Sequence, residues 1–159
     1  MKPTLLKLTA ILLILAGVFT SCKETPDTPF IEDDTTIKCG IIKINDEEYL
    51  KMCTSPKQVS INSSTTLKLI LENHTKEEMF WGQPYRLEHY NGSDWIPIKL
   101  NVNFELIGYI LKPLEIAEQQ FFLSDMNSQT LGKYRVIKNV NLGAQVYVIY
   151  AEFEIIKNQ

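Results

Sequence analysis

The sequence predicts an all-β protein, a single β-sandwich of about seven to eight antiparallel strands that follows an export signal and a short tether. Beyond residue 36, apolar residues alternate with polar ones, which is the two-residue period of a strand with one buried face. Short clusters of Gly, Asn, Asp and Pro interrupt this alternation and are typical of turns. No long segment has the period of an amphipathic helix. We therefore expect residues 37–159 to form two packed sheets.

The chain begins with the features of an export signal. Lys2 and Lys7 form a short positive region, and residues 8–19 are apolar or small apart from Thr9. This run has the length of the apolar part of a signal peptide and is shorter than the roughly 20 residues that span a bilayer. We expect residues 1–21 to be a signal peptide that is removed on export.

The end of this segment, Phe19-Thr20-Ser21-Cys22, resembles the lipobox of bacterial lipoproteins. Phe19 and Thr20 depart from its commonest form, Leu-Ala-Gly-Cys. In such proteins the cysteine thiol carries a diacylglyceryl group, and the amine freed by cleavage takes a further acyl chain such as palmitate, which holds the protein on a membrane. The resemblance implies lipidation of Cys22. The alternative is an ordinary secretory signal in which this cysteine is incidental.

Residues 22–36 predict a disordered acidic tether, because they contain two prolines, five acidic residues and few apolar ones. Lys23-Glu24 is similar to the signals that send lipoproteins of the Bacteroidetes to the cell surface. Asp34-Thr35-Thr36 is similar to their O-glycosylation acceptor. We therefore expect the protein on the bacterial outer membrane, at its periplasmic or its cell-surface face. The formal net charge of −3 disfavours a nucleic-acid partner.

Cys39 and Cys53 begin the folded part, and such a pair in an oxidising compartment is more often a disulfide than a metal site. If residues 45–47 form a hairpin loop, Ile44 faces Glu48. The same register then sets Cys39 opposite Cys53, within reach of a disulfide bond. A longer connection between the two cysteines fits the sequence as well.

The strand pattern is clearest in residues 66–72, where Leu67, Leu69 and Leu71 face one way. Asn91-Gly92 predicts a tight turn, because these residue types readily adopt positive φ angles, so the strands beside it should be neighbours. A long connection is expected at residues 100–114. The other expected strands are residues 78–81, 85–90, 95–100, 116–123, 134–140 and 145–156.

Three stretches together resemble a family of bacterial immunoglobulin-like domains that recurs in lipoproteins and other exported proteins. They are Leu67-Lys68-Leu69-Ile70-Leu71-Glu72-Asn73-His74-Thr75, Trp95-Ile96-Pro97-Ile98 and Leu131-Gly132-Lys133-Tyr134-Arg135-Val136-Ile137. The resemblance covers roughly residues 58–156 and implies a single immunoglobulin-like β-sandwich. Residues 112–115 differ from the Pro-Gly turn that the family often has there. Residues 131–134 also look like the tyrosine corner of sandwich domains, in which the hydroxyl of Tyr134 would bond back to nearby backbone.

The sequence has no recognisable catalytic or metal-binding pattern. The two histidines are His74, expected in a turn, and His89, expected in a strand, and neither is accompanied by a recognisable nucleophile and acid. Together with Cys39 and Cys53 they lack the close paired spacings of zinc sites. No Gly-rich phosphate loop occurs. We therefore expect no enzyme activity, no metal and no cofactor.

Four aromatic residues, Trp81, Tyr85, Tyr90 and Trp95, are the candidate ligand-binding residues, although core packing is the commoner use of such side chains. The sequence favours a monomeric, noncatalytic, membrane-anchored module of the cell envelope that binds or positions another macromolecule. One alternative is glycan recognition through the four aromatic residues. Another is an accessory subunit or inhibitor of an envelope enzyme that acts through residues 100–114.

Overall fold

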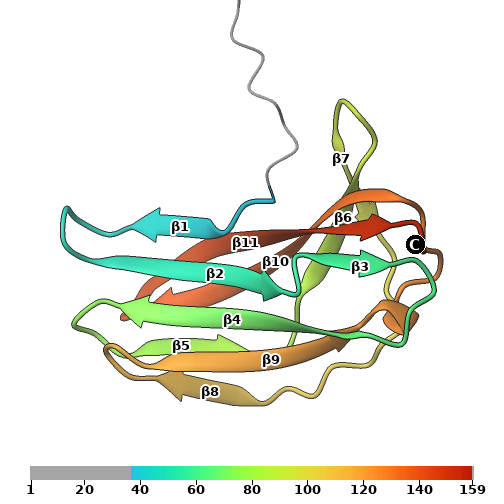
Figure 1. The fold of residues 1–159 in the computed structure, drawn as a ribbon. Helices are drawn as coiled ribbons and strands as arrows, with labels where there is room; N and C mark the ends of the chain where they lie inside the picture. The colour runs from blue at the N-terminus through green and yellow to red at the C-terminus, as the bar shows by residue number, and fades with distance from the viewer. Residues whose placement is uncertain (1–36, 159) are drawn as a thin grey trace, which may run out of the picture. The chain divides into compact units, whose positions relative to one another are not determined.

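The computed structural model describes residues 37–158, so the predictions made for the signal peptide, Cys22 and the tether lie outside the described residues. Within these residues the chain forms eleven strands and one short helical turn. The strands make two sheets that pack against each other (Figure 1), which confirms the predicted all-β sandwich. The structure has eleven strands where the sequence predicts about seven to eight, because several strands are too short to show a clear alternation.

The first sheet has the order β1-β2-β4-β9 and is antiparallel throughout. Its strands are β1 (Gly40–Lys43), β2 (Tyr49–Ser55), β4 (Thr66–His74) and β9 (Ile116–Phe122). β4 has the predicted alternation: Leu67, Leu69 and Leu71 are buried, while the residues between them are half-buried on the other face. The inward face of β4 therefore supplies one wall of the core.

The second sheet has the order β3-β11-β10-β5-β8, with a β6–β7 hairpin that also pairs with β10. The strands are β3 (Gln58–Ser60), β5 (Met79–Gly82), β6 (Arg86–Tyr90), β7 (Trp95–Ile98), β8 (Gly108–Leu111), β10 (Gly132–Leu142) and β11 (Gln145–Ile156). The predicted turn at Asn91-Gly92 lies between β6 and β7, which are neighbours as expected, with Tyr90 opposite Trp95. Gly92 has a φ of 102°, which suits glycine.

β10 has two successive partners along one of its sides. Tyr134 near its start lies opposite His89 of β6, and Val140 near its end lies opposite Trp81 of β5. Between β5 and β6 the chain leaves the ladder at residues 83–85. The backbone carbonyl groups of this interruption have no ladder partner in β10, so they need a hydrogen-bond donor from a side chain.

The expectation of one long connection at residues 100–114 was wrong in part, because residues 108–111 form β8 and pair with β5. β8 was missed since it has no alternation: Gly108, Tyr109 and Ile110 are all exposed, and only Leu111 is buried. Gly108 also lets the strand approach Phe80 closely, because a β-carbon at this position would overlap the Phe80 ring. β8 and β9 follow each other in the chain but belong to different sheets: β8 is an edge strand of the second sheet and β9 is an edge strand of the first.

A disulfide joins Cys39 to Cys53, whose Cα atoms are 4.5 Å apart. Gly40 lies opposite Met52 in the β1–β2 ladder, and the same register places the two cysteines opposite each other. This is the register that the hairpin loop at residues 45–47 predicts. The bridge ties the start of the described chain to a central strand of the first sheet.

Tyr134 forms a tyrosine corner and is fully buried. Its hydroxyl donates to the carbonyl oxygen of Thr130 at 2.8 Å and accepts the N–H of the same residue at 3.0 Å. The Tyr134 ring stacks on Phe153 of β11, and Phe153 meets Phe121 of the first sheet with ring centroids 5.6 Å apart. These three rings join the two sheets at the centre of the core.

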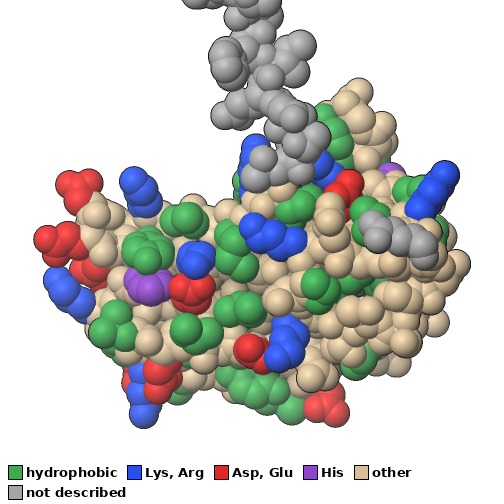
Figure 2. Space-filling view, in the orientation of Figure 1, with side chains coloured by type: hydrophobic (Ala, Val, Ile, Leu, Met, Phe, Trp, Pro, Cys, Tyr) green, Lys and Arg blue, Asp and Glu red, His purple; other side chains and the backbone are tan. Residues whose placement is uncertain are grey.

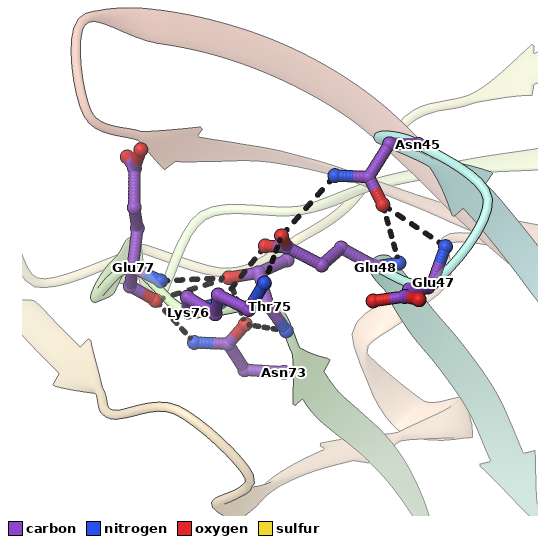
Figure 3. Close-up of polar contacts among 7 residues, drawn as sticks. All are labelled: Asn45, Glu47, Glu48, Asn73, Thr75, Lys76 and Glu77. Carbon is purple, nitrogen blue, oxygen red and sulfur yellow. Dashed lines mark hydrogen bonds and ion pairs between the residues drawn. The ribbon is translucent and has the colours of Figure 1, made fainter.

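Buried Asn73 ties together the loops at one end of the sandwich (Figure 3). Its Nδ2 donates to the carbonyl oxygens of Glu77 at 2.8 Å and Leu111 at 3.0 Å. Its Oδ1 accepts the N–H and the hydroxyl of Thr75 at 3.1 and 2.7 Å. The backbone N–H of Asn73 donates to the Glu115 carbonyl at 3.1 Å. Because its side-chain donors and acceptor all have partners, this amide can be buried at little cost.

Glu48 joins the β1–β2 loop to the β4–β5 loop (Figure 3). Its carboxylate accepts the backbone N–H of Lys76 at 3.0 Å and the Nδ2 of Asn45 at 3.1 Å. The bond from Lys76, followed by that from Asn45, holds the pKa of Glu48 below its usual value. The two loops are thus held together by a carboxylate that stays ionised.

Candidate functional site

The structure divides the four candidate aromatic residues into two pairs. Trp81 and Tyr85 are each 6% exposed, and both line a groove of about 530 Å³. Tyr90 and Trp95 are half-buried and pack against each other on the β6–β7 hairpin, with ring centroids 5.2 Å apart. The four residues therefore do not form one binding platform.

The groove lies on the side of the sandwich where the sheets end in β8 and β9. Residues from β5, β8, β9, the η1 turn (Leu123–Asp125) and the segment 99–107 line it. Its aromatic lining residues are Trp81, Tyr85, Phe104, Tyr109 and Phe122. Its polar lining residues are Gln83, Asn103, Glu118, Gln119, Gln120 and Asp125, and Val102 completes the set.

Hydrogen bonds hold the polar side chains of the groove in place. Gln83 donates from Nε2 to the Tyr109 hydroxyl at 3.1 Å, and Gln119 donates from Nε2 to the Gln83 carbonyl oxygen at 2.7 Å. The Tyr85 hydroxyl donates to Asp125 Oδ2 at 3.2 Å. Burial, and then the neighbouring Asp125 carboxylate, raise the pKa of Tyr85 well above its usual value, so this phenol remains a donor.

Lys138 lies buried next to the groove and fills the interruption between β5 and β6. Its Nζ donates to the carbonyl oxygens of Gly82 at 2.6 Å and Pro84 at 3.2 Å, and to Gln119 Oε1 at 2.7 Å. The Gln83 carbonyl oxygen lies at 3.3 Å, and the Trp81 ring centroid lies 5.1 Å from the nitrogen. Burial lowers the pKa of Lys138 to about 7. Lys138 thus fixes the backbone from which Trp81 and Gln83 enter the groove.

The other aromatic pair surrounds Arg135 of β10. The Arg135 guanidinium carbon lies 4.6 Å from the Trp95 ring centroid and 5.5 Å from that of Tyr150. Its Nε donates to Glu88 Oε2 at 2.6 Å. A guanidinium that stacks between rings and binds a carboxylate holds the β6–β7 hairpin against β10. We assign Tyr90 and Trp95 to this structural cluster.

Exposed apolar side chains gather beside the groove. Fourteen large apolar residues are exposed in the part of the chain that the structure describes, and seven of them lie within residues 106–122. We call these seven the edge surface: Leu106, Ile107, Tyr109, Ile110, Leu114, Ile116 and Phe122. Figure 2 shows apolar side chains along the lower margin of the molecule, where Figure 1 places β8 and β9. Such a concentration is typical of a surface that contacts another molecule.

The two histidines have structural surroundings. His74 contacts Glu72 Oε2 at 2.8 Å, and its ring stacks on Tyr49 at 4.3 Å. The His89 ring packs against Tyr134 at 4.7 Å. Across residues 37–158, no group of three or more His, Cys, Asp or Glu side chains could hold a metal ion. None of the described segments is a helix long and apolar enough to cross a membrane.

Sequence reasoning missed Lys138, Tyr109, Gln119 and Asp125. A signal for Lys138 exists, because the inward positions of β10 are Tyr134, Val136, Lys138, Val140 and Leu142. A lysine among apolar inward residues predicts a buried ammonium that needs several acceptors. The other three come from separate elements and carry no sequence signal.

A family model described as a bacterial Ig-like domain matches residues 46–154, and domains of this kind are typically noncatalytic. Among solved structures, the chain is similar to a Pseudomonas fluorescens alkylpurine DNA glycosylase bound to DNA containing an abasic site analog. The identity is 15%, the TM-score is 0.34, and the match covers 65% of this chain and 29% of that one. A β-glucosidase from Listeria innocua has 21% identity and a TM-score of 0.33 over 68% of this chain and 16% of its own. The chain thus spans less than a third of either enzyme. No curated protein matches the sequence.

Proposed function

Because the chain belongs to the bacterial Ig-like domain family, we propose that it is a noncatalytic binding module of the cell envelope, held on a membrane by lipid on Cys22. Its role is to bind or position a partner macromolecule. The family assignment supports a binding module. The N-terminal sequence supports the anchor, and the edge surface supports the partner.

The anchor is proposed on the outer membrane, at the periplasmic or the cell-surface face. Lys2 and Lys7, the apolar run at residues 8–19 and the lipobox-like residues 19–22 support this location. Two or three acyl chains on Cys22 give stable attachment, whereas one chain would bind reversibly.

Metabolic labelling with a palmitate analogue tests the anchor. Wild type should take up the label and enter the detergent phase on Triton X-114 partitioning. Cys22→Ala should lose the label and enter the aqueous phase or retain an uncleaved signal. Ser21→Ala is the matched control, because it keeps a small residue beside the cysteine, and it should behave as wild type. Unlabelled wild type, or detergent-phase Cys22→Ala with a cleaved signal, would contradict the anchor.

The partner is proposed to be an envelope protein that covers the edge surface. The observation that carries this is the exposure of apolar residues on the two edge strands: Ile110 of β8 is 60% exposed and Ile116 of β9 is 63% exposed. β8 and β9 also each lack a strand partner on their outer side among the described residues. Apolar side chains beside unpaired strand edges favour protein association.

An accessory subunit of an envelope enzyme is a specific form of this function. It is favoured by the position of Leu106 and Ile107, 96% and 43% exposed, in the segment that leads into β8. An envelope enzyme that docks on Leu106 and Ile107 would bury these two side chains in the interface. This chain would then act as a subunit without contributing a catalytic residue.

In-cell photocrosslinking tests the partner surface. A photoreactive amino acid replaces Ile110 in one variant and Val146 of β11 in the other, since the two positions have nearly equal exposure, 60% and 59%. We expect a crosslinked product of defined mass from position 110 that is absent from position 146. A third variant carries the photoreactive amino acid at Ile116. It should give a crosslinked product with the same partner, and adding Ile110→Lys to it should abolish that product. Equal products from both strands, or none from either, would refute the proposed surface.

A further inference from the structure

The groove beside the edge surface has a lining that suits a small, hydroxyl-rich ligand. We propose that it binds a short stretch of neutral saccharide, with Tyr109 and Trp81 as the aromatic contacts and the Tyr109 hydroxyl and Asp125 as polar contacts. The groove shares Tyr109 and Phe122 with the edge surface, but a saccharide is a different ligand from the proposed protein partner, and its binding does not depend on the lipid anchor.

The size of the groove suits such a ligand. Its volume of about 530 Å³ lies within the roughly 300–1,000 Å³ of small-molecule sites. A site of this size takes a few sugar rings and no folded partner. The groove opens where β8 and β9 end their sheets, so a longer chain could pass through the site without entering the core.

The charge of the lining favours a neutral ligand. Glu118 and Asp125 are the charged groups among the lining residues, and no lysine or arginine lines the groove. Lys138 lies nearby, but its ammonium is already directed at four protein oxygens. Glu118 is paired with Lys68 at 2.7 Å, whereas Asp125 bonds to the neutral Tyr85 hydroxyl. An anionic saccharide would therefore meet the Asp125 carboxylate without a cation in the lining, which disfavours it.

The aromatic side chains of the groove provide apolar surfaces on which a sugar ring can pack. Tyr109 is 36% exposed, and one of its faces stacks on Trp81 at 4.7 Å with 28° between the rings. Phe122, also in the groove lining, is 44% exposed. The C–H face of a sugar ring packs on such rings while its hydroxyl groups point outward to polar partners. A Tyr109 ring held by Trp81 loses little freedom when a ligand stacks on it.

The polar groups have unused hydrogen-bonding capacity that hydroxyl groups would complement. The Tyr109 hydroxyl accepts from Gln83 and keeps its own proton to donate. Asp125 accepts from Tyr85 through Oδ2 and has further acceptor capacity. The indole Nε1 of Trp81 is buried and has no acceptor among the described residues. A hydroxyl group both donates and accepts, so a ligand rich in hydroxyls can bind to the Tyr109 hydroxyl and to Asp125, whereas the buried Nε1 of Trp81 lies out of its reach in this arrangement.

Intrinsic fluorescence of the detergent-solubilised full chain tests the site. The chain has two tryptophans, so Trp95→Phe leaves Trp81 as the only indole reporter, and it lies in the groove. Maltotetraose, cellotetraose and chitotetraose are the neutral probes, and tetragalacturonate is the anionic probe. We expect at least one neutral probe to change the Trp81 emission in a saturable way, and the anionic probe to bind at least tenfold more weakly.

Two groove variants and a matched control complete the test. Tyr109→Ala should weaken binding at least tenfold, and Tyr109→Phe, which removes only the hydroxyl, about threefold. Tyr150→Ala on β11 removes a tyrosine of similar exposure, 40%, outside the groove and should bind as the parent does. Unchanged melting temperatures identify folded variants. If no neutral probe binds, if Tyr109→Phe and Tyr109→Ala both bind normally, or if only a short extended peptide such as Ala-Val-Ala-Val-Ala changes the emission, the saccharide assignment is wrong.

Discussion

Replacing Lys138 tests how the interruption between β5 and β6 is held. Lys138→Met keeps the length and apolar stem of the side chain and removes the ammonium. The Gly82 and Pro84 carbonyls and Gln119 Oε1 then lose their bond to Nζ, whereas the Gln83 carbonyl keeps the bond from Gln119 Nε2. Three buried acceptors at about 1 kcal/mol each give a loss of about 3 kcal/mol in the free energy of unfolding at pH 7. For a domain of this size that corresponds to a melting temperature lower by about 10 °C.

The pH dependence gives a second measure of the same residue. Burial lowers the Lys138 pKa to about 7, so between pH 7 and the unfolded pKa the unfolded chain binds more protons than the native one. The stability contributed by this group therefore rises with pH across that window and is lost as pH falls toward 7. With an unfolded pKa of 10.5, wild type should gain roughly 2 kcal/mol relative to Lys138→Met between pH 7 and pH 9.

Urea denaturation followed by circular dichroism, at pH 7 and pH 9, measures both effects. Lys99→Met is the control, because Lys99 is exposed, and it should change stability by less than about 0.5 kcal/mol. A Lys138→Met protein as stable as wild type at pH 7 would show that the ammonium is not what holds residues 82–84. Parallel pH profiles for the two proteins would show that Lys138 does not titrate in this range.

Three further outcomes follow from the described contacts. Cys39→Ala with Cys53→Ala should lower the free energy of unfolding by about 3 kcal/mol in urea, because the bridge closes a loop with a sequence separation of 14, and an unchanged midpoint would contradict this. Tyr134→Phe should cost about 1–2 kcal/mol in the same assay, since the Thr130 N–H loses its acceptor, and a neutral effect would argue against the tyrosine corner. Arg135→Lys should cost about 1 kcal/mol and shift the emission of Trp95, because an ammonium cannot stack as a guanidinium does; identical spectra would exclude the stacking role.

The parts of the fold that sequence could predict are those with local causes. The alternation in β4 follows from one buried face, and the Asn91-Gly92 turn follows from the backbone freedom of its residues. The register of Cys39 with Cys53 follows from counting back from a loop of known length. Each of these depends on residues close together in the chain.

The groove could not be predicted, because its residues converge from separate elements. Trp81 lies in β5, Tyr109 in β8, Gln119 in β9 and Asp125 in the η1 turn, and their approach depends on which strands end the two sheets. β8 itself has no alternation, so the edge of the second sheet was missed. The contact of Tyr90 with Trp95 could not be predicted either, because sequence proximity does not show on which side of a sheet a ring lies.

The position of the disulfide determines how the domain bears a mechanical load. A pull on the chain ahead of residue 37 first loads the hydrogen bonds of Lys38 with Glu152 of β11 and then Cys39, where the covalent bridge passes the tension to Cys53 of β2. β1 is thereby shielded from being peeled away one hydrogen bond at a time. The tension instead meets the long β2–β4 ladder, so rupture requires many of its bonds to yield together.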